Sequence, residues 1–325
     1  MDRSARRFRF SLAAHEAADR PRTFTPEGWR ELARKTEALG YCTLHVADHY
    51  LDRGRAPQFL APIAAMATAA AVTTTLRIGS RVFCIDYHVP AALAKEAATL
   101  DYLSEGRLEL GLGAGWSQVE YESMGLVFEA PPRRISRLEE VVALMKAHFS
   151  GEEMDCRGRS VHVGGYKGLP PPVQQPRPRL MIGGGKKRVL SLAAREADIV
   201  SFSNTPFAPR NETGQTPHDV AVERLGFVES AAGNRLPALE IESSPYFTAI
   251  TDDRSQQEAA LRVVADRFGV PPEGLREHPN VLVGSESEIV ERLQFRREHY
   301  GVHYVAVPES QTDAFAPIAA RLTGT

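Results

Sequence analysis

The amino-acid sequence of 325 residues predicts an α/β protein, a (β/α)8 TIM barrel, on three observations. Short apolar runs typical of buried strands alternate eight times with amphipathic stretches typical of helices. The turns between them are short, apart from insertion segments at about 151–178 and 203–235. Polar or glycine-rich residues follow most strands, which is where barrel enzymes carry their functional groups. A (β/α)8 barrel accounts for this count better than a doubly wound sheet, and we expect it to form a single domain over residues 1–325.

The stretch 76–116 shows the repeat most clearly. Leu76–Cys84 has the composition of a strand, and Ala91–Leu103 places small and apolar residues at helical spacing. A polar stop signal at 104–106 ends that helix. Arg107–Leu112 then alternates as the next strand, so the stretch predicts two parallel strands joined by a helix.

The remaining elements follow the same rhythm along the chain. The other predicted strands are Phe8–Ala14, Cys42–Ala47, Arg179–Ile182, Asp198–Phe202, Leu239–Ile250 and Val302–Val307. The other predicted helices are one capped by Thr25 and ended by Gly40, and Ala61–Ala71, Arg134–Phe149, Val189–Glu196, Val220–Ala232, Ser255–Phe268, Glu286–Tyr300 and Asp313–Leu322. The first insertion predicts a hairpin at Glu152–Tyr166 with a proline-rich connector after it, and Ser203–Gln215 is a candidate lid.

The composition excludes several classes of protein. Hydrophobic residues make up 43% of the chain, which supports a large core, and the net charge of −2 argues against a nucleic-acid partner. The basic start is followed by only a short apolar run, so we expect no signal peptide, no membrane span and a cytoplasmic location. Cys42, Cys84 and Cys156 are far apart and odd in number, which predicts free thiols.

The residues that follow the strands form the expected functional face of the barrel. They are His15, Asp48, His49, residues 84–86, 113–116 and 183–187, Ser203, Asn204, residues 244–246, Pro308 and Glu309. The expected substrate pocket draws on His15, Tyr50, Ser203, Asn204 and Tyr246. Metal ligands at close spacing do not occur in this set, so no metal is expected. The sequence also has no Gly-x-Ser-x-Gly elbow, which argues against nucleophilic hydrolysis.

Two glycine-rich segments follow predicted strands. Residues 183–187 read Gly-Gly-Gly-Lys-Lys before a helix, where backbone amides, the helix dipole and two ammonium groups favour a phosphate. The alternative for this segment is an ordinary glycine turn followed by solvated lysines. Residues 111–115 are not spaced as a dinucleotide fingerprint, so they fit either a close approach to a ligand or a tight packing turn.

Single polar and aromatic residues at strand ends each allow two interpretations. His49 is either a general acid or hydrogen-bond donor, or a histidine bonded to its own loop. Trp116, Tyr50 and Tyr246 are either stacking surfaces for a planar ligand or ordinary core at the barrel rim. Cys84 is more typical of a buried small hydrophobe than of a reactive thiol.

In whole segments the sequence resembles the bacterial-luciferase-like flavin and deazaflavin oxidoreductases, and among them the branch that uses coenzyme F420. The segments are ALGYCTLHVADHY, LRIGSRVFCIDYHVPAALAKEAATLDYLSEGRLELGLGAGW, PRLMIGGGKKRVLSLAAREADIV and GVHYVAV, in family order over most of the chain. The resemblance implies a luciferase-like TIM barrel with coenzyme F420, or alternatively FMN, and a small organic substrate. Family members are often homodimers, and Ala61–Ala71 is the helix expected to pack against a second copy.

By the same resemblance, cofactor contacts fall on defined positions. A non-proline cis peptide is implied at Arg81–Val82, against the face of the ring. The residues implied to line the ring and ribityl chain are Asp48, Cys84, Ala114 and Gly115. Those implied to hold the phosphate, mostly through backbone amides, are Gly184, Gly185, Lys186, Arg188 and Val189. His49 matches the acid or base of the sugar-phosphate and alcohol dehydrogenases of the family.

The chain departs from those dehydrogenases at two positions. Trp116 stands where they have a glutamate, and Pro206 stands where they have a lysine for a substrate phosphate. A proton relay and a sugar-phosphate pocket are therefore disfavoured, and Trp116, as a residue facing the reaction, favours a larger and less charged substrate. The pocket walls are expected from Asp52–Pro57 and Ser203–Gln215.

Three hypotheses remain at this stage. The first is an F420-dependent oxidoreductase that transfers hydride between the deazaflavin C5 and an activated C=C, C=N or C=O bond. The second is a monooxygenase that uses reduced FMN. The third, from a different class, is a cofactor-binding barrel without catalysis.

Overall fold

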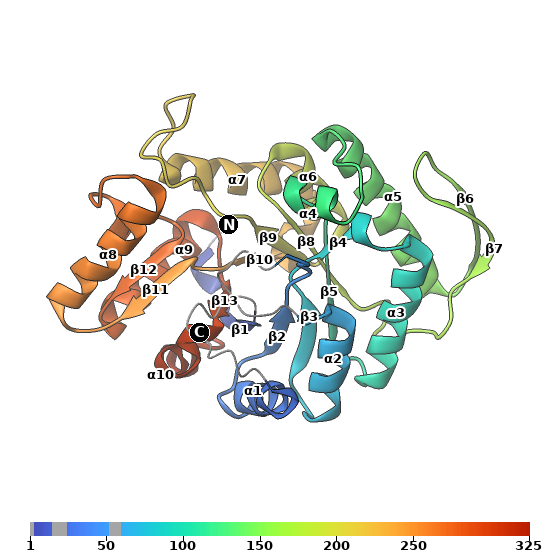
Figure 1. Ribbon diagram of the computed structural model, residues 1–325, viewed down its shortest axis with the longest axis horizontal. Helices are drawn as coiled ribbons and strands as arrows, with labels where there is room; N and C mark the ends of the chain where they lie inside the picture. Colours follow the sequence, from blue (N-terminus) through green and yellow to red (C-terminus); the bar gives the residue numbers. More distant parts are fainter. Residues whose placement is uncertain (1–2, 15–24, 52–59) are drawn as a thin grey trace.

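The computed structural model describes residues 3–14, 25–51 and 60–325 and has a closed parallel barrel at its centre (Figure 1). The barrel strands are β1 (Arg9–Ala14), β2 (Thr43–Val46), β3 (Arg77–Ser80), β4 (Phe83–Cys84), β5 (Leu108–Gly113), β8 (Arg179–Gly184), β9 (Ile199–Phe202), β10 (Glu240–Ser243) and β13 (Tyr304–Pro308). Both β3 and β4 pair with β5, and β13 pairs with β1, so the sheet closes on itself. The predicted TIM barrel is confirmed, with β3 and β4 as one interrupted strand.

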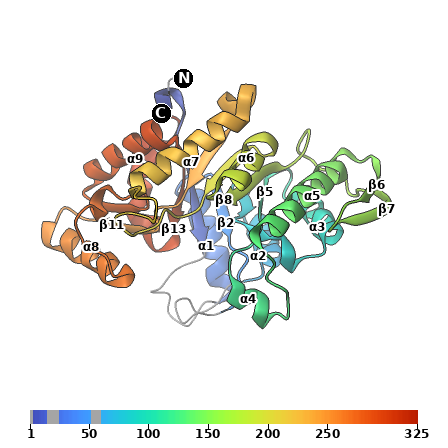
Figure 2. The same cartoon turned by 90° about the horizontal axis from the view of Figure 1, so that it is seen from above.

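Helices surround the barrel and join its strands (Figures 1 and 2). They are α1 (Pro26–Ala38), α2 (Pro62–Ala71), α3 (Pro90–Leu103), α4 (Gln118–Ser123), α5 (Pro131–Ser150), α6 (Lys187–Glu196), α7 (Pro217–Ala232), α8 (Arg254–Phe268), α9 (Glu286–Tyr300) and α10 (Thr312–Leu322). Thr25 caps α1 as predicted, because its side chain accepts the Gly28 amide. None of these described helices is long and apolar enough to cross a membrane.

The first insertion is an antiparallel hairpin, as predicted. Strands β6 (Glu153–Arg157) and β7 (His162–Lys167) pair with each other and not with the barrel. The hairpin projects beyond α3 and α5 at one side of the molecule (Figures 1 and 2).

The prediction of one strand over Leu239–Ile250 is wrong. This stretch divides into β10, in the barrel, and β11 (Phe247–Ile250), which pairs with β12 (Val281–Gly284) in a separate two-stranded sheet. The break falls at residues 244–246, where Pro245 cannot donate to a ladder of hydrogen bonds. Strand β12 was not predicted from the sequence, because it is short and directly follows a polar loop.

The candidate lid at 203–215 is anchored on this extra sheet. The ring of Phe207 is stacked between Phe268 of α8, at 3.9 Å, and His278, at 4.2 Å between centroids. Helix α7, which follows the loop, is an ordinary barrel helix between β9 and β10. The extra sheet and α8 lie on the opposite side of the molecule from the β6–β7 hairpin (Figure 1).

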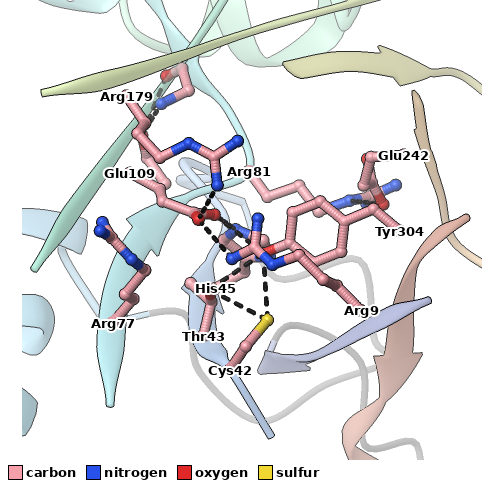
Figure 3. Close-up of polar contacts among 12 residues, drawn as sticks. Arg9, Cys42, Thr43, His45, Arg77, Arg81, Glu109, Arg179, Glu242 and Tyr304 are labelled. Atoms are coloured by element: carbon pink, nitrogen blue, oxygen red, sulfur yellow. Dashed lines mark hydrogen bonds and ion pairs between the residues drawn. The ribbon is translucent and has the colours of Figure 1, made fainter. Parts of the chain in front are cut away.

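Charged groups, rather than aliphatic layers alone, fill part of the barrel interior (Figure 3). The carboxylate of Glu109 is fully buried and accepts hydrogen bonds from Arg9 at 2.9 Å and from the Tyr304 hydroxyl at 2.8 Å. Arg179 lies 3.5 Å away from the same carboxylate. Burial alone would raise the pKa of Glu109. His45 and these arginines nevertheless hold this pKa well below its usual range. The network fills this part of the interior with paired charges.

Candidate functional site

A buried glutamate lies beside His49 at the carboxyl ends of β2 and β5. Nδ1 of His49 is 3.0 Å from Oε2 and 3.1 Å from Oε1 of Glu120, which belongs to the first turn of α4. Glu120 is only 1% exposed, and its carboxylate also accepts the backbone amide of Tyr50 and the hydroxyl of Tyr87. Burial would raise the pKa of Glu120, but the hydrogen bonds from His49 and the backbone amides lower it. The pair is therefore an imidazole next to an ionised carboxylate.

This glutamate corrects one interpretation of the sequence. Trp116 in place of the family's glutamate disfavours a proton relay, whereas α4 supplies a carboxylate to His49 from Glu120, four residues further on. The spacing Ser117-x-x-Glu120, typical of a helix start, is the signal that locates this short helix in the sequence. Nδ1 of the His49 ring bonds to Glu120 of α4 and not to its own loop, and the same carboxylate accepts the amide of Tyr50.

Aromatic rings line the same mouth. Trp116 is 66% exposed, and its ring meets that of His49 edge-on at 5.9 Å between centroids. Tyr50 is 49% exposed and packs edge-on against Tyr87 at 5.4 Å. The alternative that Trp116 and Tyr50 belong to the ordinary core is wrong, because both present large apolar faces to solvent.

Asp48 fixes the loop that follows β4. Its Oδ2 accepts the backbone amide of Cys84 at 3.0 Å and lies 2.8 Å from Nε2 of His88. Its Oδ1 is buried and has no hydrogen-bond partner among the described residues. Burial raises the pKa of the Cys84 thiol to about 11, and its sulfur lies 3.2 Å from the Tyr121 hydroxyl. Cys84 is thus a protonated packing group at neutral pH, in line with the expected inert thiol.

The glycines after β5 are required by close packing. A Cβ on Gly113 would lie 2.7 Å from the side chain of Val82, and one on Gly115 would lie 2.1 Å from the Tyr121 hydroxyl. Gly115 also has a φ of +71°, which favours glycine. Arg134 of α5 donates from Nη1 to the carbonyl oxygens of Ala114 and Gly115. The packing alternative therefore holds for this segment, and Arg134 fixes its backbone.

The implied cis peptide is present at Arg81–Val82. Val82 lies between two barrel strands, next to Gly113 of β5 and 3.4 Å from a Cβ position on Gly183 of β8. The side chain of Arg81 points into the barrel, where Nε donates to Glu242 of β10 at 3.0 Å (Figure 3). At the carboxyl-end mouth of the barrel, Arg81 therefore presents its backbone and not its guanidinium.

The glycine-rich turn after β8 leads directly into α6. The N-cap residue is Lys186, and no side chain caps the helix, so the first-turn amides are open to an anion. A Cβ on Gly184 would lie 2.3 Å from Cγ1 of Val189, which explains the glycine. Lys186 and Lys187 are exposed. The guanidinium of Arg188 instead donates to Pro132, Ser136 and Glu139 on α5, which leaves its amide as the group on the turn.

The predicted substrate-pocket residues do not all gather at His49. Tyr50 does, whereas Ser203 packs against Gly185 and its amide donates to the Gly184 carbonyl at 2.9 Å. The Tyr246 hydroxyl accepts from Arg267 at 3.0 Å, within the aromatic cluster of the extra sheet.

The other predicted pocket residues are Asn204, His15 and the loop Asp52–Pro57, and no metal is predicted. The Asn204 side chain accepts from Asn280, at 3.3 Å. His15 and the loop Asp52–Pro57 lie outside the described residues. Within the described ranges no group of His, Cys, Asp and Glu side chains is arranged to hold a metal ion.

Comparison with known proteins shows the family to which the chain belongs. Residues 6–265 match the model of the luciferase-like monooxygenase family. The chain belongs to this family. A relative, an uncharacterized protein of Mycobacterium tuberculosis, is 30% identical over 260 residues, which cover 74% of this chain and 86% of that protein.

Solved structures share the luciferase-like fold at low identity. Monooxygenase RslO1 from Streptomyces bottropensis has a TM-score of 0.75 at 20% identity, covering 97% of both chains. The coenzyme F420 dependent tetrahydromethanopterin reductase from Methanopyrus kandleri has 0.72 at 17%, covering 95% of this chain and 97% of its own. Riboflavin lyase with modified FMN has 0.77 at 15%, covering 97% and 91%. Membership in this family of oxidoreductases supports an enzyme.

Proposed function

We propose that this luciferase-like protein is a coenzyme F420-dependent oxidoreductase that transfers hydride between the deazaflavin and a small organic substrate. The observation that carries the proposal is the buried Glu120 held against His49 at the barrel mouth. Hydride transfer to a C=C, C=N or C=O bond requires a proton at the other atom of that bond, and a positioned imidazole is the usual donor. When bound, reduced F420 supplies the hydride from C5 of its ring.

Glu120 and His49 divide the proton chemistry between them. The ionised carboxylate of Glu120 accepts the proton on Nδ1 of His49, which fixes the tautomer and orientation of the ring. Nε2 is then the nitrogen that exchanges a proton with the substrate. The carboxylate also stabilises the imidazolium that forms in the oxidising direction.

The surrounding residues fit a flat cofactor with a phosphate-bearing tail. The Val82 side chain lies against Gly113 and near Gly183, and this partly buried surface is where we place the ring. Asp48 keeps one carboxylate oxygen without a described partner next to this surface, which suits a ring N–H. The uncapped start of α6 suits the phosphate.

The substrate is a weakly charged molecule with a sizeable apolar or planar part. The exposed faces of Trp116 and Tyr50 flank His49 and are the groups available to pack on it. Pro206 in place of a lysine argues against a phosphorylated sugar.

Titration of the purified protein with F420 and, separately, with FMN tests the choice of cofactor. Each is measured under oxidising and reducing conditions by fluorescence or absorbance. Tighter binding of F420 in either state is the expected result. Clearly tighter binding of FMN in both states would overturn the assignment.

A monooxygenase that uses reduced FMN is the second candidate, favoured by the description of the matching family. Oxygen consumption that depends on reduced FMN and organic substrate identifies this activity. A cofactor-binding barrel without catalysis is the third candidate, and loss of turnover with retained cofactor binding in His49→Ala would argue against it. For the assembly we propose a homodimer, which sedimentation velocity tests directly.

A further inference from the structure

A buried arginine lies directly beneath the glycine-rich turn that precedes α6. Arg224 comes from α7 and is 6% exposed. Its Nη2 lies 2.9 Å from the position a Cβ on Gly185 would take, so the guanidinium packs against the turn itself. Nη1 donates to the carbonyl oxygen of Ser203 and Nη2 to that of Asn204, at 3.2 Å.

The positive charge of Arg224 has no carboxylate partner among the described residues. Arg9, Arg81 and Arg179, which are also well covered, each form ion pairs with buried or half-buried glutamates. Arg224 bonds only to backbone carbonyls, and its Nε has no described hydrogen-bond partner. Burial lowers the pKa of Arg224 to about 10, so it remains charged at neutral pH. The charge of the neighbouring Glu223 offsets only part of the effect of burial. A buried cation without a contacting carboxylate is costly, and a nearby anion relieves that cost.

Arg224 meets other polar groups at this turn. The guanidinium and the hydroxyl of the exposed residue Ser203 both lie next to Gly185, and Oγ of Ser203 is 2.2 Å from the Cβ position on that glycine. The open first-turn amides of α6 lie on the same turn, with Lys186 and Lys187 exposed at its edge. Backbone donors, a hydroxyl and a buried positive charge together match a phosphate group.

We propose that Arg224 is a positioning residue whose buried charge completes a phosphate-binding site at the turn 183–189. The ligand is the phosphate group of a cofactor, whether a phosphodiester as in F420 or a phosphomonoester as in FMN. This inference rests on the proposed function for the source of the phosphate, but not for the site. Arg224 acts through the backbone of Gly185 and Ser203, and its field favours the anion above them.

The matched control for Arg224 is Arg235. It also donates to two carbonyl oxygens, those of Ala194 and Ala197, at the opposite end of α6. Replacing either arginine removes one positive charge and two carbonyl hydrogen bonds. Only Arg224 lies at the phosphate turn, so a difference between the two variants reports the site and not general stability.

The experiment compares Arg224→Gln, Arg224→Lys and Arg235→Gln in the full chain. For each variant the dissociation constants of F420 and of its ribityl-deazaflavin core are measured, and likewise those of FMN and riboflavin. The FMN pair differs only by the phosphate, whereas the F420 pair differs by the phosphodiester and the tail that it carries, and the ratio within each pair measures that difference. We expect Arg224→Gln to reduce that ratio about tenfold, Arg224→Lys to keep most of it, and Arg235→Gln to leave it unchanged. An unchanged ratio in folded Arg224→Gln overturns the inference.

The arms of the experiment separate this inference from the proposed function. If only the FMN pair responds, F420 dependence fails and the Arg224 site stands. Thermal unfolding in inorganic phosphate against chloride at equal ionic strength needs no cofactor. Phosphate stabilises folded proteins in general, so it should raise both midpoints, but that of wild type more than that of Arg224→Gln. Should that variant not fold, the wild-type response decides: a rise that saturates at low phosphate supports the site, and one that only increases steadily with phosphate, as a general salt effect does, overturns it.

Discussion

His49 and Glu120 are 71 residues apart in the sequence, and their side chains lie 3.0 Å apart in the structure. The short helix α4 brings this about, because it begins directly after the glycines that end β5 and aims its first turn at the loop after β2. The carboxylate is buried by Tyr87, Tyr50 and the loop, which strengthens its interaction with the imidazole.

Glu120→Gln tests the proton role of this pair. The amide preserves the shape but not the charge that supports the imidazolium, so we expect kcat to fall about 10- to 100-fold, with His49→Ala at least as impaired. Glu122→Gln is the matched control, since Glu122 lies on the same helix, is exposed and bonds only Gln118 among the described residues. Steady-state rates measure the effect. Wild-type turnover in Glu120→Gln would remove Glu120 from the mechanism.

Trp116→Phe tests the exposed surface at the mouth by fluorescence. The chain has two tryptophans, of which Trp29 is 4% and Trp116 is 66% exposed. We expect the emission of wild type to be quenched by cofactor and by acrylamide, and the remaining emission of the variant to be blue-shifted and poorly quenched. The free energy of unfolding should change by less than about 0.5 kcal/mol, because the side chain is exposed. Equal quenching of both proteins contradicts a site next to Trp116.

Gly184→Ala tests the close packing of the phosphate turn. The new methyl group meets Cγ1 of Val189 at 2.3 Å, so the turn must shift and cofactor affinity should fall about tenfold or more. The double variant Gly184→Ala, Val189→Ala removes the clash and should recover much of the affinity. In contrast, Gly226→Ala on α7 meets nothing within 4 Å and should increase stability by up to about 1 kcal/mol without a change in affinity. The same affinity in all three variants would contradict a role for the turn.

Glu37 makes stability depend on pH at the connection between α1 and β3. Its carboxylate accepts the backbone amides of Thr74, Thr75 and Leu76 at 2.6–2.9 Å. Burial opposes the effect, but these hydrogen bonds lower the pKa of Glu37 to about 2, below the value of about 4.3 in the unfolded chain. The stabilisation is therefore complete above about pH 5 and is lost as the pH falls towards 2.

Urea unfolding of Glu37→Gln measures this contribution. The variant should be less stable than wild type by about 1 kcal/mol at pH 7, and the difference should disappear as the pH approaches 2. Glu31→Gln, an exposed position on the same helix, should show no difference at either pH. A pH-independent difference would show that the charge of Glu37 is not the cause.

Local patterns in the sequence were sufficient for most of the framework. Proline at the first helical position, Thr25 as a cap and the alternation of apolar residues predict elements such as α1, α3 and β5 nearly to their ends. These patterns do not predict the extra sheet of β11 and β12, because no local pattern within Leu239–Ile250 indicates which of two sheets a strand joins.

The sequence by itself determined the barrel, the glycine-rich turn before α6 and the place of His49 at the end of β2, since each follows from local patterns: the alternation of strand-like and helix-like stretches, and the residues directly after a strand. Only the tertiary structure decided the partners of these groups. Glu120 reaches His49, and Arg224 reaches Gly185, across separate elements of the barrel. Such pairings depend on how whole strands and helices pack, and a buried charge is identified only when its surroundings are known.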